Sequence, residues 1–344
     1  DVYAAPLIRA SLNGKPVPLD RVGRFSVEVP LKPGANTLKL QAAAPNPRQQ
    51  TTMISAFIDG SMVYGSDEAF AKSLRTLQGG RMKTSGDNLL PLDADGLFFL
   101  AGDIRANENL ELLAIHTLFL REHNQIADAI AKANPELDDE TIYQQARRIV
   151  AAELQVITYQ EFLPALLGPG ALRAYRGYDP AVNPGIATEF STAAFRIGHT
   201  MVAGDIGFLD NDGNEVRAEV DLADAFFNPA PIKETGPDPL LKYLASDNAQ
   251  EVDTQIVTAL RDFLFGPPGA GGLDLASLNI ERGRDHGIAD YNTVRKAYGL
   301  PPVRDFHQIT RDVSLAEKLR SLYGSPDSLD LWIGGLAEDH VPGS

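Results

Sequence analysis

The chain has 344 residues, 44% of them hydrophobic, which is enough for a packed core in one large domain or two modest ones. Its 31 basic and 46 acidic side chains give a net charge of −15, which argues against nucleic acids and anionic membrane surfaces as partners. The absence of cysteine excludes disulfides and thiolate metal sites, and no apolar run reaches the roughly eighteen residues of a membrane span.

Residues 1–45 have the alternating pattern of β-strands. Apolar side chains recur there at every second position, namely at Phe25, Val27, Val29 and Leu31. Asn13-Gly14 is a typical two-residue hairpin turn between two further apolar stretches. We therefore predict about three or four strands that resemble the end of an immunoglobulin-like module and are too few to close a sandwich.

From residue 46 to residue 344, apolar residues recur at helical spacing. The segments with this pattern, predicted to be helices, are residues 110–130, 141–163, 184–202 and 252–265. Pro164 and the Gly-Pro-Gly sequence after it are expected to end the second helix. Residues 46–344 are therefore predicted to form one mainly α-helical domain with little strand.

One hairpin is predicted around residues 206–216, where Asn-Asp-Gly is a turn sequence. Asp210, Asp212 and Glu215 carry carboxylates of the kind that bind calcium, but their spacing does not fit an EF-hand loop. We favour a plain turn here.

Two segments far apart in the sequence suggest a cofactor site, FRIGHTM at 195–201 and LNIERGRDHG at 278–287. A histidine that binds iron through one ring nitrogen needs an acceptor for the other, and Asn279 is a candidate acceptor for His199. Arg196, Arg282 and Arg284 carry guanidinium groups suited to the two propionates of a porphyrin. A lone histidine in an apolar segment is more often a core residue than a ligand, so the residues alone leave both interpretations open.

The chain resembles the animal-type haem peroxidases of the peroxidase and cyclooxygenase superfamily, and among them the bacterial peroxidasin- or myeloperoxidase-like members. The resemblance rests on FRIGHTM and on SAFIDGSMVYGS (55–66), FLAGDIRANENLELLAIHTLFLREHN (99–124), ITYQEFLPALLG (157–168), LNIERGRDHGIADYN (278–292) and LDLWIGG (329–335). It implies a helical domain that binds haem b, with His199 on the iron, Asn279 hydrogen-bonded behind it, and Arg196 and Arg282 beside the propionates. The cyclooxygenase sequence Tyr-His-Trp-His-Pro is missing, which favours the peroxidase branch.

Arg105 and Glu108 lie three positions apart, which puts them on one face of a helix or helical turn. Taken alone, such a pair is more often a solvated ion pair. The resemblance implies instead that Arg105 is the distal arginine, which polarises the peroxide, and that Glu108 forms an ester with a haem methyl group. Asn109 stands where the myeloid member has a methionine, so a sulfonium link is not expected.

Ser55, Phe57, Asp59 and Ser61 place hydroxyl, carbonyl and carboxylate oxygens at every second position of a short loop. Such a set can wrap one calcium ion, and a plain polar turn would look similar. The resemblance places calcium at this loop.

His116 and His123 lie on one face of the predicted helix at 110–130. Metal-binding pairs on helices more often have closer spacing, and the resemblance assigns both residues to packing and hydrogen bonding. We predict a structural role for them.

The distal histidine is the main departure from the family. The family supplies this base from a Gln-x-x-Asp-His-Asp stretch upstream of the calcium loop, whereas all 6 histidines of this chain follow the loop. The same stretch would carry a second ester carboxylate and the last calcium ligand. The chain also ends before the closing helical segment of the family, so we expect a peroxidase domain incomplete at both ends.

The leading hypothesis is a secreted haem peroxidase that reduces hydrogen peroxide and oxidises a halide or a small organic donor such as a phenol. The alternative is a catalytically incomplete haem-binding or adhesion module of a larger secreted protein. The immunoglobulin-like segment and the missing distal residues make that alternative tenable. Neither hypothesis includes a nucleic-acid partner or a membrane span.

Overall fold

The computed structural model divides the chain into two compact units, Asp1–Met53 and Ile54–Ser344. This boundary lies a little beyond the one drawn from the sequence pattern at residue 45. The residues that the structure describes are 9–12, 15–17, 40–43, 55–168, 170–266 and 272–340.

The described part of the first unit is a small antiparallel sheet with the strand order β2-β1-β3. Its strands are β1 (Arg9–Leu12), β2 (Lys15–Val17) and β3 (Leu40–Ala43). Leu12 pairs with Lys15, so two residues join β1 to β2, as the Asn-Gly turn predicts. The strand expected around Val27 lies outside the described residues, and the immunoglobulin-like module stays a prediction.

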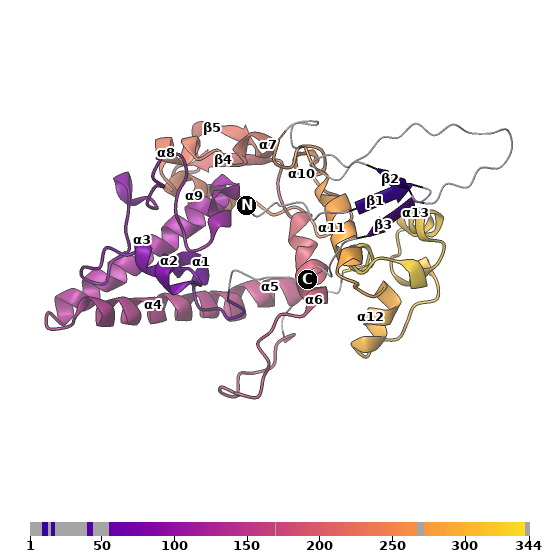
Figure 1. Ribbon diagram of the computed structural model, residues 1–344, viewed down its shortest axis with the longest axis horizontal. Coiled ribbons are helices and arrows are strands. Elements are labelled where there is room, and N and C mark those ends of the chain that lie inside the picture. The colour runs from indigo at the N-terminus through magenta and orange to yellow at the C-terminus, as the bar shows by residue number, and fades with distance from the viewer. Residues whose placement is uncertain are drawn as a thin grey trace. The chain divides into compact units, whose positions relative to one another are not determined.

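The second unit is mainly helical, which confirms the predicted fold class (Figure 1). Its α-helices are α1 (Ser61–Tyr64), α2 (Glu68–Ser73), α3 (Leu110–Ala133), α4 (Asp139–Val156), α5 (Leu163–Leu167), α6 (Thr188–Thr192), α7 (Leu222–Ala225), α8 (Ala230–Thr235), α9 (Asp238–Ser246), α10 (Thr258–Arg261), α11 (Leu275–Asp285), α12 (Tyr291–Ala297), α13 (Val313–Tyr323) and α14 (Leu331–Leu336). The other helical segments are η1 (Gly86–Asn88), η2 (Ile104–Glu108), η3 (Ile157–Phe162), η4 (Ala194–His199), η5 (Phe306–Gln308) and η6 (Pro326–Ser328).

The two longest helices, α3 and α4, pack against each other (Figure 1). Helix α3 begins where the Asn109 side chain accepts the Leu112 N–H at 2.8 Å. Helix α4 begins in the same way, with Asp138 accepting the Thr141 N–H at 2.7 Å. Each cap satisfies a backbone donor that the first helical turn leaves free. The helix predicted at 110–130 is therefore confirmed, and Asn109 caps it.

The second predicted helix continues past the point where Pro164 was expected to end it. After α4 the chain widens into a π-helical stretch, η3, and then returns to α geometry in α5. Pro164 lies in the first turn of α5, where a missing N–H matters least. The helical run ends at Gly168, whose φ of 83° is accessible to glycine at little cost.

The third and fourth predicted helices are shorter than expected. The third is split into α6 and η4 at Ala193, whose φ of −132° and ψ of −71° are not helical. Ala193 is buried against Trp332, so tertiary packing outweighs local helical preference there. Of the fourth, only α10 forms, and the preceding Val257, with a φ of −59° and a ψ of 148°, is not helical.

The predicted hairpin is present as β4 (Asp205–Leu209) and β5 (Glu215–Asp221). In its turn, Asp210 Oδ1 accepts the N–H groups of Asp212 and Asn214. Gly213 has a φ of 84°, the left-handed conformation that this turn requires. The Asp210 carboxylate is used within the turn, in agreement with the favoured interpretation.

Three hydrophobic clusters position the segments that carry the candidate site. The largest cluster contains Ala106 of η2, and Leu278 of α11 packs against this cluster. A small cluster around Trp332 includes Ile197 of η4 and Ile280 of α11. A third cluster holds α12, α13 and the chain before α14 together. Within the described part of the chain, no helix combines the length and apolar character needed to cross a bilayer.

Candidate functional site

His199, Asn279 and Arg196 form a connected group, although Asn279 is far from the other two in the sequence. Asn279 Nδ2 lies 2.7 Å from His199 Nδ1, and Arg196 Nη1 donates to Asn279 Oδ1 at 2.9 Å. Asn279 is only 1% exposed. The structure thus brings together the histidine and the asparagine that the sequence pairs, and adds Arg196 to them.

The polarity of this group differs from the expected one, in which Asn279 accepts from His199. A guanidinium can only donate, so Arg196 takes the amide oxygen, and the amide nitrogen then faces His199. With this orientation His199 Nδ1 is the acceptor and its Nε2 carries the proton. Binding iron through Nε2 requires the proton on Nδ1, and hence a half-turn of the Asn279 amide.

Burial and positive charge keep His199 neutral. Burial, with a further effect from the Arg196 charge, lowers the pKa of His199 to about 4. A neutral imidazole is the form that binds a metal. Burial also lowers the pKa of Arg196, and the charge of Arg282 lowers it further.

Arg196 and Arg282 lack an anionic partner among the residues that the structure describes. Arg196 Nε is buried and has no hydrogen-bond partner among the described residues. Among the described residues, no carboxylate forms an ion pair with Arg196 or Arg282. Two neighbouring cations, one with an unused buried donor, fit a ligand that brings carboxylates.

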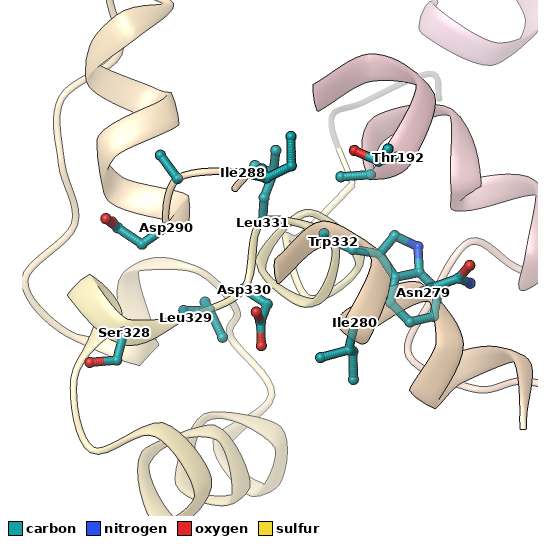
Figure 2. Close-up of a pocket in the computed structure, with 13 residues that line it drawn as sticks. Thr192, Asn279, Ile280, Ile288, Asp290, Ser328, Leu329, Asp330, Leu331 and Trp332 are labelled. Carbon is teal, nitrogen blue, oxygen red and sulfur yellow. The ribbon is translucent and has the colours of Figure 1, made fainter. Parts of the chain in front are cut away.

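Trp332 packs against the two segments that carry this group, η4 and α11. Its Nε1 donates to the Arg196 carbonyl at 3.2 Å, and its ring packs among Ile197 and Ile280. Figure 2 shows it beside Asn279 at a cavity of about 120 Å³. This volume suits about four water molecules and is too small for a porphyrin. Trp332 was not singled out from the sequence, although the LDLWIGG segment contains it.

Arg284, which was expected near the propionates, is already paired. Its Nε and Nη2 donate to the two carboxylate oxygens of Asp330 at 3.0 and 2.7 Å. Tyr323 donates its hydroxyl proton to the same carboxylate at 2.9 Å. Arg284 therefore ties the end of α11 to the residue before α14 and is not available to a ligand.

Arg105 lies on η2 and pairs with Asp103, which precedes that turn. Its Nε lies 3.0 Å from Asp103 Oδ1, and its Nη2 lies 2.5 Å from Oδ2. The ion pair considered for Arg105 and Glu108 is not formed. Asp103 was missed, although an aspartate directly before a helical turn is a typical N-cap, and Asp103 accepts the Arg105 N–H.

Burial and the interactions with Arg105 shift the pKa values of Asp103 and Glu108 in opposite directions. Burial acts to raise the pKa of Asp103, but the hydrogen bonds from Arg105 outweigh it and the pKa is lowered. The same bonds raise the pKa of Arg105. Burial raises the pKa of Glu108 against the opposing charge of Arg105. Arg105 therefore stays charged, and its side chain is 57% exposed.

The proposed calcium loop is a polar turn in this structure. The Phe57 N–H donates to Ser55 Oγ at 3.1 Å, and the Ser61 N–H donates to Asp59 Oδ1 at 3.0 Å. In the part of the chain that the structure describes, no three or more acidic or histidine side chains gather as a metal site. A set built from hydroxyl and carbonyl oxygens with one carboxylate is not of that kind, so calcium stays a prediction.

His116 and His123 are buried and hydrogen-bonded to the backbone, in line with a structural role. His116 Nδ1 lies 2.6 Å from the Leu112 carbonyl, and His123 Nε2 lies 2.8 Å from the Gly80 carbonyl. Burial lowers the pKa of both side chains.

The chain is similar in sequence to proteins of one known family. The sequence profile of the animal haem peroxidases matches residues 22–344. Peroxinectin A of Dictyostelium discoideum is 40% identical over 315 residues, which cover 86% of this chain and 58% of that protein. The peroxidasin homolog of Homo sapiens is 40% identical over 341 residues, which cover 90% of this chain and 23% of that protein.

Solved structures give the same result. Peroxidase A from Dictyostelium discoideum superposes with a TM-score of 0.78 at 40% identity, over 84% of this chain and 59% of that one. The fatty acid alpha-dioxygenase of Oryza sativa has a TM-score of 0.69 at 21% identity, over 91% of this chain and 57% of that one, and shares the fold. The chain spans about three fifths or less of the relatives named here. It belongs to the animal haem peroxidase family.

Proposed function

We propose that this chain binds haem b, and that the protein to which it belongs is a peroxidase that reduces hydrogen peroxide and oxidises a halide or small organic donor. The observation that carries the proposal is the group of His199, Asn279 and Arg196. It combines a neutral histidine, held by Asn279 through Nδ1, with a buried arginine that has no anionic partner among the described residues.

The arginines fit the two haem propionates. A carboxylate at Arg196 and Arg282 would use the free Nε donor and relieve the repulsion between the two cations. It would also give Arg196 a second acceptor, which allows the Asn279 amide to turn its oxygen toward His199 Nδ1. The proton then lies on Nδ1, and Nε2 is free to bind iron. Occupation of the arginines thus favours the ligating form of His199.

On the other side of the site, we assign Arg105 to the peroxide and Glu108 to an ester with a haem methyl group. The bound haem supplies an iron centre that accepts oxidising equivalents from peroxide and passes them to the donor. Arg105 supplies a permanent positive charge that stabilises negative charge on the peroxide oxygen. Its exposed side chain must turn away from Asp103 to do so. The histidine that takes the peroxide proton in the family has no counterpart in this sequence.

Two further features belong to the proposal. Calcium would be held by Ser55 Oγ, the Phe57 carbonyl, Asp59 and Ser61 Oγ, with the remaining ligands from water or other chain segments. We also propose an extracellular location, which is supported by similarity to proteins such as chorion peroxidase of Drosophila melanogaster, 39% identical over 319 residues.

Haem binding is tested by titrating the full chain with haemin and following tryptophan fluorescence. The chain has 1 tryptophan, Trp332, and it lies beside Asn279, so haem at His199 should quench its emission by energy transfer. Quenching and an imidazole-type Soret band are expected for the wild type. Both should be lost in His199→Ala and kept in His307→Ala, which removes a partly exposed histidine from another part of the unit.

Activity is tested by adding hydrogen peroxide with bromide or guaiacol to the haem-loaded chain. Turnover above that of free haemin, reduced in Arg105→Gln, supports the peroxidase assignment. Haem binding without such turnover in the whole protein to which the chain belongs would contradict the assignment.

A further inference from the structure

Tyr64 of α1, His123 of α3 and Tyr143 of α4 form a buried aromatic group. Tyr64 and His123 are both 0% exposed, and Tyr143 is 2% exposed. The Tyr64 ring lies edge-on to both others, with centroid distances of 5.2 Å to His123 and 5.9 Å to Tyr143. The proposed function uses none of these residues.

The direction of the hydrogen bonds in this group is fixed by the Gly80 carbonyl. A carbonyl only accepts, so His123 Nε2, 2.8 Å away, carries the proton and donates it. His123 Nδ1 therefore has a free electron pair, and the Tyr64 hydroxyl, at 2.8 Å, donates to it. Burial lowers the pKa of His123 to about 4, so the ring is neutral and able to accept a proton.

Tyr143 provides an internal comparison because it lies in the same environment without a base. Its hydroxyl is buried and has no hydrogen-bond partner among the described residues. The Arg75 guanidinium lies 3.7 Å from the Tyr143 ring centroid, whereas Arg147 lies 5.2 Å from that of Tyr64. A close cation opposes removal of an electron from a ring. Tyr143 is therefore the harder of the two phenols to oxidise.

We propose that Tyr64 and His123 are a proton-coupled redox pair that gives one electron to a one-electron oxidant of high potential. The Tyr64 O–H bond breaks, the electron leaves the phenol for the oxidant, and the proton moves to His123 Nδ1. The products are a neutral Tyr64 phenoxyl radical, an imidazolium that still donates to Gly80, and the oxidant reduced by one electron. The arginines near the imidazolium oppose its charge, so only a strong oxidant drives the step.

The identity of the natural oxidant depends on the proposed function, because a haem enzyme that consumes peroxide generates oxidants of this class. The pair would then take up an oxidising equivalent when the donor is scarce. The chemistry of the pair itself does not depend on haem. It is therefore tested with an external oxidant, so that failure of the pair and failure of haem binding give different results.

The experiment oxidises the full chain without haem by photogenerated tris(bipyridine)ruthenium(III) and freezes it for electron paramagnetic resonance. The chain has 10 tyrosines, so the radical must be assigned by substitution. We expect a persistent tyrosyl radical that is lost in Tyr64→Phe and kept in Tyr143→Phe. In deuterium oxide, electron-nuclear double resonance should show an exchangeable deuteron hydrogen-bonded to the radical oxygen.

His123→Gln separates the redox role from a structural one. The glutamine amide can donate to Gly80 and accept from Tyr64, but it has no basic nitrogen to hold the proton. We expect loss of the radical with a cooperative melt close to that of Tyr143→Phe. An undiminished radical in Tyr64→Phe or in a folded His123→Gln would overturn the proposal. So would a wild-type radical without the exchangeable deuteron, a measurement that needs no variant.

Discussion

Replacing Asn279 by leucine tests whether its amide is the element that joins Arg196 to His199. Leucine has a similar volume and cannot hydrogen-bond, so the bond from Arg196 and the bond at His199 are both lost. A bond to a charged group contributes about 1.5–3 kcal/mol and a neutral one about 0.5–1.5 kcal/mol. Arg196 would then hold two unpartnered donors, Nη1 and the already unpartnered Nε. We expect the free energy of unfolding to fall by about 2–4 kcal/mol.

The assay is urea denaturation of the full chain at pH 7, read from the fluorescence of Trp332, the 1 tryptophan of the chain. Asn279→Asp is the matched control, because it keeps the size of the side chain and gives Arg196 a carboxylate. It should recover most of the lost stability and raise the pKa of His199, since a nearby negative charge favours the imidazolium. Haem affinity should fall by about 10–100-fold in Asn279→Leu, the usual effect of removing a hydrogen bond behind a metal ligand.

Two results would refute this reasoning. The first is a loss of less than about 1 kcal/mol in Asn279→Leu, below the range for a charged hydrogen bond. The second is an Asn279→Asp variant as unstable as the leucine one, because a carboxylate there would then give Arg196 no benefit.

Three other predictions concern residues outside the group of His199, Asn279 and Arg196. The His123 pKa is 6.5 when unfolded and about 4 when folded, so its contribution to stability is complete above pH 6.5 and is lost as the pH falls toward 4. In urea titrations, the free energy of unfolding of the wild type should fall between pH 7 and pH 5 by about 2 kcal/mol more than that of His123→Gln. Gly102→Ala should cost about 1–3 kcal/mol or more, because a Cβ there would lie 2.4 Å from Gly65 N and Ser61 O. Gly86→Ala, with open space around it, should change the thermal midpoint little. Calcium should raise the midpoint of the wild type and not that of Asp59→Ala, and equal shifts in both would exclude the loop as the calcium site.

Helix α3 was predictable because the evidence for it is local. Its apolar stripe recurs at helical spacing, and Asn109 directly before it is a favourable cap. The division of the third predicted helix was not predictable in this way. It depends on Ala193 packing against Trp332, a residue far along the chain, and local periodicity carries no information on such a contact.

The candidate site, too, was only partly predictable from the sequence. Motif resemblance paired His199 with Asn279, and the structure places the two side chains in contact. Neither the motif nor its spacing indicated that Arg284 is held by Asp330, or that Arg105 is held by Asp103. From the sequence alone, every arginine near the motif is an equally good candidate for binding a carboxylate ligand. Only the positions of the carboxylates within the fold show which arginines are already paired.

The orientation of the Asn279 amide shows how these contacts change the interpretation of a motif. The sequence leads one to expect an acceptor behind His199, because a ligating histidine needs one. The structure has a donor there, because Arg196 can only donate and takes the amide oxygen. The two orientations of the amide would belong to different states of the protein. A carboxylate that reaches Arg196 when haem binds would leave the amide free to turn its oxygen toward His199. Such a carboxylate would supply an acceptor to Arg196 Nε, which is buried and has no hydrogen-bond partner among the described residues. Arg196 would therefore link recognition of the propionates to the protonation state of the iron ligand.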